Sequence, residues 1–193
     1  MNTNQITGFV LAGGKSRRMG IDKSLMLLNG KTLIEYSIDA LRPLCNSVII
    51  SSNNSIYDFT GCEVWPDELT DQAPIVGIYS CLKRSKTDIN IILSCDMPLI
   101  STNIVEYLLE NSINQSITVP VHENGFIEPM CGIYKQSAIA ILKEYIDMGN
   151  FRLNDCILTS SYRLVPTYQL SFSSPNTFIN INTHEDFNGL LSL

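Results

Sequence analysis

The chain has 193 residues, enough to bury one hydrophobic core but short for two, so we expect a single domain over residues 1–193. A hydrophobic content of 45% and a charged content of 17% exclude a disordered composition. A formal net charge of -6 argues against the basic surface of a nucleic-acid-binding protein, so no nucleic-acid partner is expected.

The N-terminus and the cysteines predict a cytoplasmic protein. Met1 to Thr7 lacks the basic segment of a signal peptide, and the apolar run Phe9–Ala12 is too short to span or target a membrane. No membrane partner is therefore expected. The six cysteines form no Cys-x-x-Cys pair and no metal-ligand spacing, and a chain with this aliphatic content needs no disulfide framework. We expect reduced thiols.

Apolar runs of strand length alternate with helical patterns, which predicts an α/β protein with a mostly parallel central sheet. The runs are Gly8–Leu11, Val48–Ile50, Ile89–Leu93 and Ile117–Val119. A further short strand ends near Trp65. The stretch from Glu123 to Tyr134, interrupted by Gly125 and Pro129, is expected to form strands outside the main parallel order.

Capping and stop signals place helices between these strands. Thr32-x-x-Glu35 is a capping box, and the helix that it opens should end before Pro43. Further helices are expected from Pro74 to Arg84, after Ser101, from Lys135 to Gly149, and from Thr183.

Residues 11–23 follow the first predicted strand and combine three glycines with four cations in the string Leu11-Ala12-Gly13-Gly14-Lys15-Ser16-Arg17-Arg18-Met19-Gly20-Ile21-Asp22-Lys23. Glycine lets backbone N–H groups approach an anion closely, and the cations supply counter-charge, so the loop predicts polyphosphate binding. The spacing is neither that of a P-loop nor that of a dinucleotide-binding fingerprint. From these residues alone, a glycine turn with a solvated basic face is the alternative.

Two aspartates also follow predicted strands, at the edge where open α/β sheets bind ligands. Asp96 comes directly after the apolar strand that contains Leu93, and one carboxylate beside phosphate oxygens suits Mg²⁺. Asp67 follows Trp65-Pro66 and can accept hydrogen bonds from a sugar or base. For both, a turn-forming aspartate next to a proline is the alternative.

Three polar residues of the C-terminal part are candidates for contacts with a ligand. Asn180 and Asn182 alternate with apolar residues, so a strand over Phe178–Thr183 would present both on one face. Arg152 follows a helix stop at Gly149 and can pair with a phosphate. A half-exposed strand and a solvated arginine are the alternatives.

The string from Leu11 to Lys23 resembles the signature of nucleotidyltransferases with a Rossmann-like, three-layer fold, and most of all the molybdenum cofactor guanylyltransferase family. Ser94-Cys95-Asp96-Met97-Pro98 is similar to that family's metal-binding segment. Asp67 resembles an aspartate that contacts guanosine, although Ala73 stands where the glycine-rich string after it usually begins. Ser51 aligns with a nucleotide-contacting asparagine.

The resemblance implies transfer of GMP from GTP to molybdopterin, which yields pyrophosphate and the molybdopterin guanine dinucleotide cofactor. It implies Mg²⁺ on Asp96 and molybdoenzymes or their chaperones as recipients of the product. The implied catalytic residues are Lys23, Arg17 and Asp96. Leu11, Ala12, Gly13, Gly14, Lys23, Ser51, Asp67 and Asp96 would bind the nucleotide, and Arg152, Asn180 and Asn182 the acceptor.

Three alternatives stay open. Cytidylyl transfer to the same cofactor, or nucleotidyl transfer to a sugar or polyol phosphate, is the nearest; such relatives more often carry Leu-Ala-Ala-Gly, so Gly14 favours guanine. A nucleotide-binding regulator without catalysis is the alternative from another class. The presence of both phosphate-side and acceptor-side residues argues against it.

Overall fold

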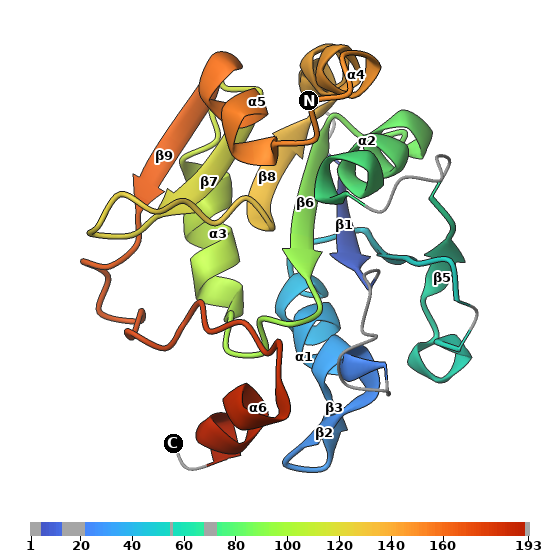
Figure 1. Cartoon of the computed structure of the whole chain (residues 1–193), viewed down its shortest axis with the longest axis vertical. Coiled ribbons are helices and arrows are strands. Elements are labelled where there is room, and N and C mark those ends of the chain that lie inside the picture. Colours follow the sequence, from blue (N-terminus) through green and yellow to red (C-terminus); the bar gives the residue numbers. More distant parts are fainter. Residues whose placement is uncertain (1–4, 13–21, 55, 68–72, 192–193) are drawn as a thin grey trace.

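A computed structural model describes residues 5–12, 22–54, 56–67 and 73–191 of the chain (Figure 1). Its central sheet has seven strands in the order β5-β4-β1-β6-β8-β7-β9. These strands are β1 (Ile6–Leu11), β4 (Ser47–Ser51), β5 (Glu63–Trp65), β6 (Ile89–Ser94), β7 (Ile117–Val121), β8 (Cys131–Lys135) and β9 (Tyr162–Pro166). A separate hairpin pairs β2 (Leu27–Leu28) with β3 (Lys31–Thr32).

Every strand of the central sheet except β8 runs in one direction. β1 pairs in parallel with β4 and β6, β4 with β5, and β7 with β9. β8 pairs antiparallel with both β6 and β7. The predicted mostly parallel sheet is confirmed, and so is the departure from parallel order between Glu123 and Tyr134, although that stretch supplies one strand of the sheet.

The strand order fixes where a ligand can bind. The chain passes outward from β1 to β4 and β5, and then returns to the other side of β1 as β6. In open α/β sheets such a reversal leaves a crevice outside the carboxyl ends of the strands. The carboxyl ends of β1, β4 and β6 are therefore the expected place for a site.

Helices cover both faces of the sheet and complete the predicted three layers (Figure 1). α1 (Leu33–Leu41) and α3 (Thr102–Glu110) pack on the face that contains Val10, whereas α2 (Pro74–Arg84), α4 (Ile139–Asp147) and α5 (Leu153–Thr159) pack on the face that contains Phe9. Because successive side chains of a strand point to opposite faces, β1 contributes to both cores. α6 (His184–Leu191) packs beside the hairpin, where Leu190 joins Leu28.

The predicted helices form, with one difference at a boundary. α2 has the predicted bounds, and α3 follows Ser101 as expected. The α4 helix ends before Gly149, whose φ of 68° is the left-handed conformation that stops a helix. It begins later than predicted, however, because Lys135 pairs with Ile89 as the last residue of β8.

The predicted strand over Phe178–Thr183 is wrong: these described residues form no strand. The backbone N–H groups that a ladder would use go elsewhere. Ile181 N donates to Asp96 O at 2.9 Å, and the N–H groups of Asn182 and Thr183 donate to the Asp186 carboxylate as α6 begins. The segment thus caps α6 and joins it to the residues that follow β6. The helix that follows is predicted correctly, since Thr183 Oγ1 accepts from Asp186 N.

Two further predictions concern the cysteines and the membrane. All six cysteines are free, as expected, and burial raises the pKa of Cys45 and Cys81 to about 12. In the part of the chain that the structure describes, no helix has the length and apolar character needed to cross a membrane.

The capping box of α1 gives a pH-dependent prediction. Hydrogen bonds from Thr32 Oγ1 and N hold the pKa of Glu35 below its ordinary value of 4.5. A carboxyl whose pKa is lower in the folded state stabilises the fold above its unfolded pKa and loses that contribution as the pH falls through the folded pKa. Glu35→Gln should therefore lower the melting temperature by about 2 °C at pH 7 and by less at pH 3.

Thermal unfolding followed by circular dichroism at the two pH values measures this difference. Glu106→Gln, at an exposed position in the middle of α3, is the matched control and should change neither value. An equal loss for Glu35→Gln at pH 7 and pH 3 would contradict the charge-dependent role of the cap.

Candidate nucleotide-binding site

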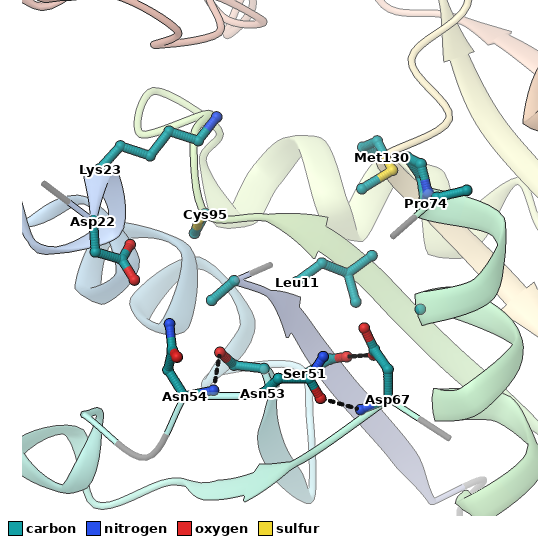
Figure 2. Close-up of a pocket in the computed structure, with 14 residues that line it drawn as sticks. Leu11, Asp22, Lys23, Ser51, Asn53, Asn54, Asp67, Pro74, Cys95 and Met130 are labelled. Atoms are coloured by element: carbon teal, nitrogen blue, oxygen red, sulfur yellow. Dashed lines mark hydrogen bonds between the residues drawn. The ribbon is translucent and has the colours of Figure 1, made fainter. Parts of the chain in front are cut away.

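A cavity of about 300 Å³ lies at the carboxyl edge of the sheet (Figure 2). In Figure 2, Asp22 and Lys23 stand on one side of it, Pro74 and Met130 on the other, and Leu11 between them. The strand ends supply most of the wall, together with the start of α2. The lining residues are Leu11, Ala12, Asp22, Lys23, Ser51, Ser52, Asn53, Asn54, Asp67, Ala73, Pro74, Gly77, Cys95 and Met130.

Lys23 and Asp96 form an ion pair at this edge. Lys23 begins a short 3₁₀ helix, Lys23–Leu25, and its Nζ lies 2.5 Å from Asp96 Oδ2, just beyond β6. Ser94 Oγ donates to the other carboxylate oxygen. Lys23 Nζ also donates to Asn182 Oδ1 at 3.3 Å. Three residues predicted from separate parts of the sequence therefore meet around one ammonium group.

The other end of the cavity is organised around Asp67. Ser51 Oγ donates to Asp67 Oδ1 at 2.9 Å, and Asp67 N donates to Asn53 Oδ1 at 3.0 Å (Figure 2). A Cβ at Gly77 would lie 3.7 Å from Asp67 Oδ1, so the glycine leaves open space beside the carboxylate. The end of β4 and the end of β5 thus hold an oriented carboxylate, beside amide and hydroxyl groups suited to a sugar or a base.

Ala73 causes no strain at the start of α2. Its φ of -94° and ψ of 144° are an extended conformation that any residue adopts. The alanine, which stands where the sequence resemblance leads us to expect a glycine, is therefore compatible with this backbone. It lines the cavity directly before Pro74, which occupies the first turn of the helix.

The donor set at Asp96 fits a magnesium ion. Within the described residues no group of three or more histidine, cysteine or acidic side chains could enclose a metal ion. Magnesium needs no such cage, because it commonly takes one or two protein oxygens and completes its shell with phosphate oxygens and water. The Asp96 carboxylate supplies one such oxygen. The Asn182 amide oxygen lies near it, because both oxygens contact the ammonium group of Lys23.

The structure places some of the other predicted site residues and does not describe the rest. Leu11 and Ala12 line the cavity, and their contact with a nucleotide stays a prediction. Gly13, Gly14 and Arg17 lie outside the described residues. Asn180 donates through Nδ2 to Phe178 O, close along the chain to Asn182.

Within the described residues, Arg152 contacts Asn150 and Asp155, but neither Asn180 nor Asn182. It is the N-cap residue of α5, with 83% of its side chain exposed, and its guanidinium lies 3.9 Å from Asp155 Oδ2.

Several residues in or beside the cavity were not identified as site residues from the sequence. Asn53 and Asn54 lie two and three residues after Ser51, the last residue of β4, and the rule that sites lie beyond strand ends could have found them. Ser94, the last residue of β6, donates to Asp96, and the sequence indicated it only as the first residue of the segment that contains Asp96. Met130 reaches the cavity because Ser94 N donates to Met130 O beside the antiparallel strand β8.

A three-layer α/β fold with a lysine–aspartate pair and a cavity at the carboxyl edge of its sheet is the arrangement in which open α/β proteins bind ligands. Residues 8–158 match the family model of the MobA-like NTP transferase domain. The chain therefore belongs to the MobA-like NTP transferase family, whose members are nucleotidyltransferases.

Two named proteins and one solved structure are similar to this chain over most of its length. A protein of Flavobacterium johnsoniae named probable molybdenum cofactor guanylyltransferase is 34% identical over 188 residues, 96% of each chain. The molybdenum cofactor guanylyltransferase of Syntrophotalea carbinolica is 32% identical over 92% of this chain and 87% of its own. The crystal structure of molybdopterin-guanine dinucleotide biosynthesis protein A from Archaeoglobus fulgidus has a TM-score of 0.81 at 23% identity, with 96% and 97% of the chains covered, and supports the fold.

The Lys23–Asp96 pair gives a stability prediction. Only 19% and 12% of the two side chains are exposed, so Lys23→Ala leaves a mostly buried carboxylate without counter-charge. We expect a loss of about 1–3 kcal/mol in the free energy of unfolding, since cavity water offsets part of the cost of breaking a buried pair. Urea unfolding measures it.

The double variant Lys23→Ala/Asp96→Asn should recover part of that loss, because it removes the unpaired charge. Lys143→Ala breaks an exposed pair with Asp147 and should cost little. Equal stability of Lys23→Ala and the unaltered chain would contradict the structural role assigned to the pair.

Proposed function

We propose that this chain transfers GMP from GTP to molybdopterin, releasing pyrophosphate and forming the molybdopterin guanine dinucleotide cofactor. The observation that carries the proposal is the cluster of Lys23, Asp96 and Asn182 beside a cavity at the carboxyl edge of the sheet. The names of relatives that align with nearly the whole chain support the choice of substrates.

The cavity suits the nucleoside part of GTP. Its volume of about 300 Å³ is at the lower end of the range for small-molecule sites, and one side is open to solvent. Ser51, Asn53 and Asp67 offer hydroxyl, amide and carboxylate groups to the sugar and the base. We therefore assign the guanosine to this end and the phosphates to Lys23.

Catalysis in this proposal is positioning and neutralisation of charge. A phosphate nucleophile is already anionic near neutral pH, so the protein needs no general base to activate it. Lys23 donates to phosphate oxygens and stabilises the charge that develops when the α-phosphorus is attacked. Asp96, with Asn182 as a second oxygen donor, would hold Mg²⁺, which supplies further positive charge at the phosphates.

The proposal keeps assignments that rest on the family resemblance. Gly13 and Gly14 would contribute to the nucleotide side, and Arg17 would neutralise charge together with Lys23. Arg152, Asn180 and Asn182 would contribute to the acceptor side. The free thiols support a cytoplasmic compartment, where cysteines are kept reduced. Molybdoenzymes or their chaperones would receive the product.

Pyrophosphate release tests the reaction directly. With molybdopterin and Mg²⁺ present, turnover should be supported by GTP in preference to CTP, ATP or UTP. Preference for CTP would instead assign the chain to cytidylyl transfer. Binding of GTP without pyrophosphate release, given authentic molybdopterin, would instead indicate a regulator.

Asp96→Asn tests the metal assignment in the same assay. Loss of the carboxylate charge should reduce turnover by about 10²-fold or more, since it removes an electrostatic contribution to the transition state. Asp147→Asn, on the exposed end of α4, is the matched control and should keep full turnover. Near-normal turnover of Asp96→Asn would overturn the assignment of the metal to this residue.

A further inference from the structure

A buried hydroxyl group lies directly behind the nucleotide site. Tyr57 belongs to the connection between β4 and β5, on the opposite side of β1 from Asp96, and it is fully buried. Its hydroxyl lies 3.1 Å from Asp22 Oδ2, 3.1 Å from Ser24 Oγ and 3.4 Å from Ala12 O. One side chain thus contacts the end of β1 and the turn that carries Lys23.

The turn around Lys23 is held from both sides. Asp22 is the N-cap of the 3₁₀ helix Lys23–Leu25, and its Oδ1 accepts from Ser24 N at 3.1 Å and from Ser24 Oγ at 2.7 Å. Its other oxygen, Oδ2, accepts from Tyr57. Lys23 therefore lies between Asp22 and Ser24, and the Asp22 carboxylate joins these two neighbours.

Packing alone does not require a tyrosine at this position. The Tyr57 ring lies in a core cluster with Val10, Ile38 and Ile50, where a phenylalanine ring would supply the same apolar surface. A buried hydroxyl costs free energy unless it is hydrogen-bonded. Burial raises the pKa of Tyr57 to about 12, so the group keeps its proton and remains a donor near neutral pH. The carboxylate of Asp22 is the strongest acceptor within its reach.

We propose that Tyr57 is a positioning residue for Lys23. Its hydroxyl fixes the Asp22 carboxylate, and the Asp22 turn directs the Lys23 ammonium toward Asp96 and the phosphates. Because Tyr57 has no exposed surface, it acts through Asp22 and does not touch the nucleotide. The inference rests on the proposed function only in assigning Lys23 to the phosphates.

The contact with Ala12 extends the same role to the end of β1. Ala12 N donates to Ser51 O at 2.9 Å, which continues the pairing of β1 with β4, and Ala12 O faces the Tyr57 hydroxyl. A tyrosine hydroxyl has a single proton, so it donates to either Asp22 Oδ2 or Ala12 O at one time, but it contacts both of these cavity-lining residues. The hydroxyl group therefore lies between the end of β1 and the turn that carries Lys23.

Tyr57→Phe removes the hydroxyl and keeps the ring. Titration calorimetry with GTP and Mg²⁺ should show an affinity about tenfold lower than that of the unaltered chain, because a hydrogen bond to a charged group is lost. Asp22→Ala should cause a similar loss. If the two residues act in series, the double variant should lose no more than the larger single loss, whereas independent effects add.

Tyr36→Phe is the matched control. It also removes one tyrosine hydroxyl, which donates to Leu28 O at 2.9 Å, but it lies on α1 beside the hairpin. It should leave GTP affinity unchanged. Melting temperatures of both variants separate positioning from folding, since a merely structural role for Tyr57 would move the melting temperature and leave the affinity unchanged.

Unchanged GTP affinity in Tyr57→Phe, or additive losses in the double variant, would overturn the inference. A preference of the unaltered chain for CTP would overturn the guanylyl proposal alone, and the same variants titrated with CTP would then test Tyr57. Failure of the unaltered chain to bind any nucleoside triphosphate would overturn both.

Discussion

The ion pair between Lys23 and Asp96 is the interaction on which the site depends. It connects the turn that begins at Lys23 with Asp96, two residues beyond β6, so it spans the point where the strand order reverses. Asn182 adds the C-terminal segment to the same ammonium group, and Ile181 N binds the backbone of Asp96. Three distant parts of the sequence are therefore held at one edge by a single pair of opposite charges and its hydrogen bonds.

The two ends of the cavity differ in the chemical groups that they present. On one side, Ser51 and Asp67 present fixed polar groups with open space beside Gly77, which suits a nucleoside. On the other, the Lys23 ammonium and the Asp96 carboxylate suit phosphates and a hard cation. Tyr57 is fully buried and does not line the cavity, but its hydroxyl contacts Asp22, the residue before Lys23. Buried polar groups behind a binding surface thus set the geometry of exposed ones.

Much of the fold could be predicted from the sequence because its buried strands and helix caps are local signals. The strands near Val10 and Leu93, the helix from Pro74 and the placement of Asp96 at a strand end follow from such signals. The strand expected around Asn182 did not form, because alternation of polar and apolar residues cannot reveal that the N–H groups cap α6. Tyr57 could not be found, since an aromatic residue in a connection indicates only core.

The most direct measurement of the central claim is a crystal structure of the chain with GTP and Mg²⁺. It should show guanosine beside Ser51 and Asp67, the metal on Asp96, and Lys23 Nζ moved from the Asp96 carboxylate to a phosphate oxygen. GTP bound elsewhere, with the Lys23–Asp96 pair unchanged, would contradict the claim that this pair marks the phosphate and metal site.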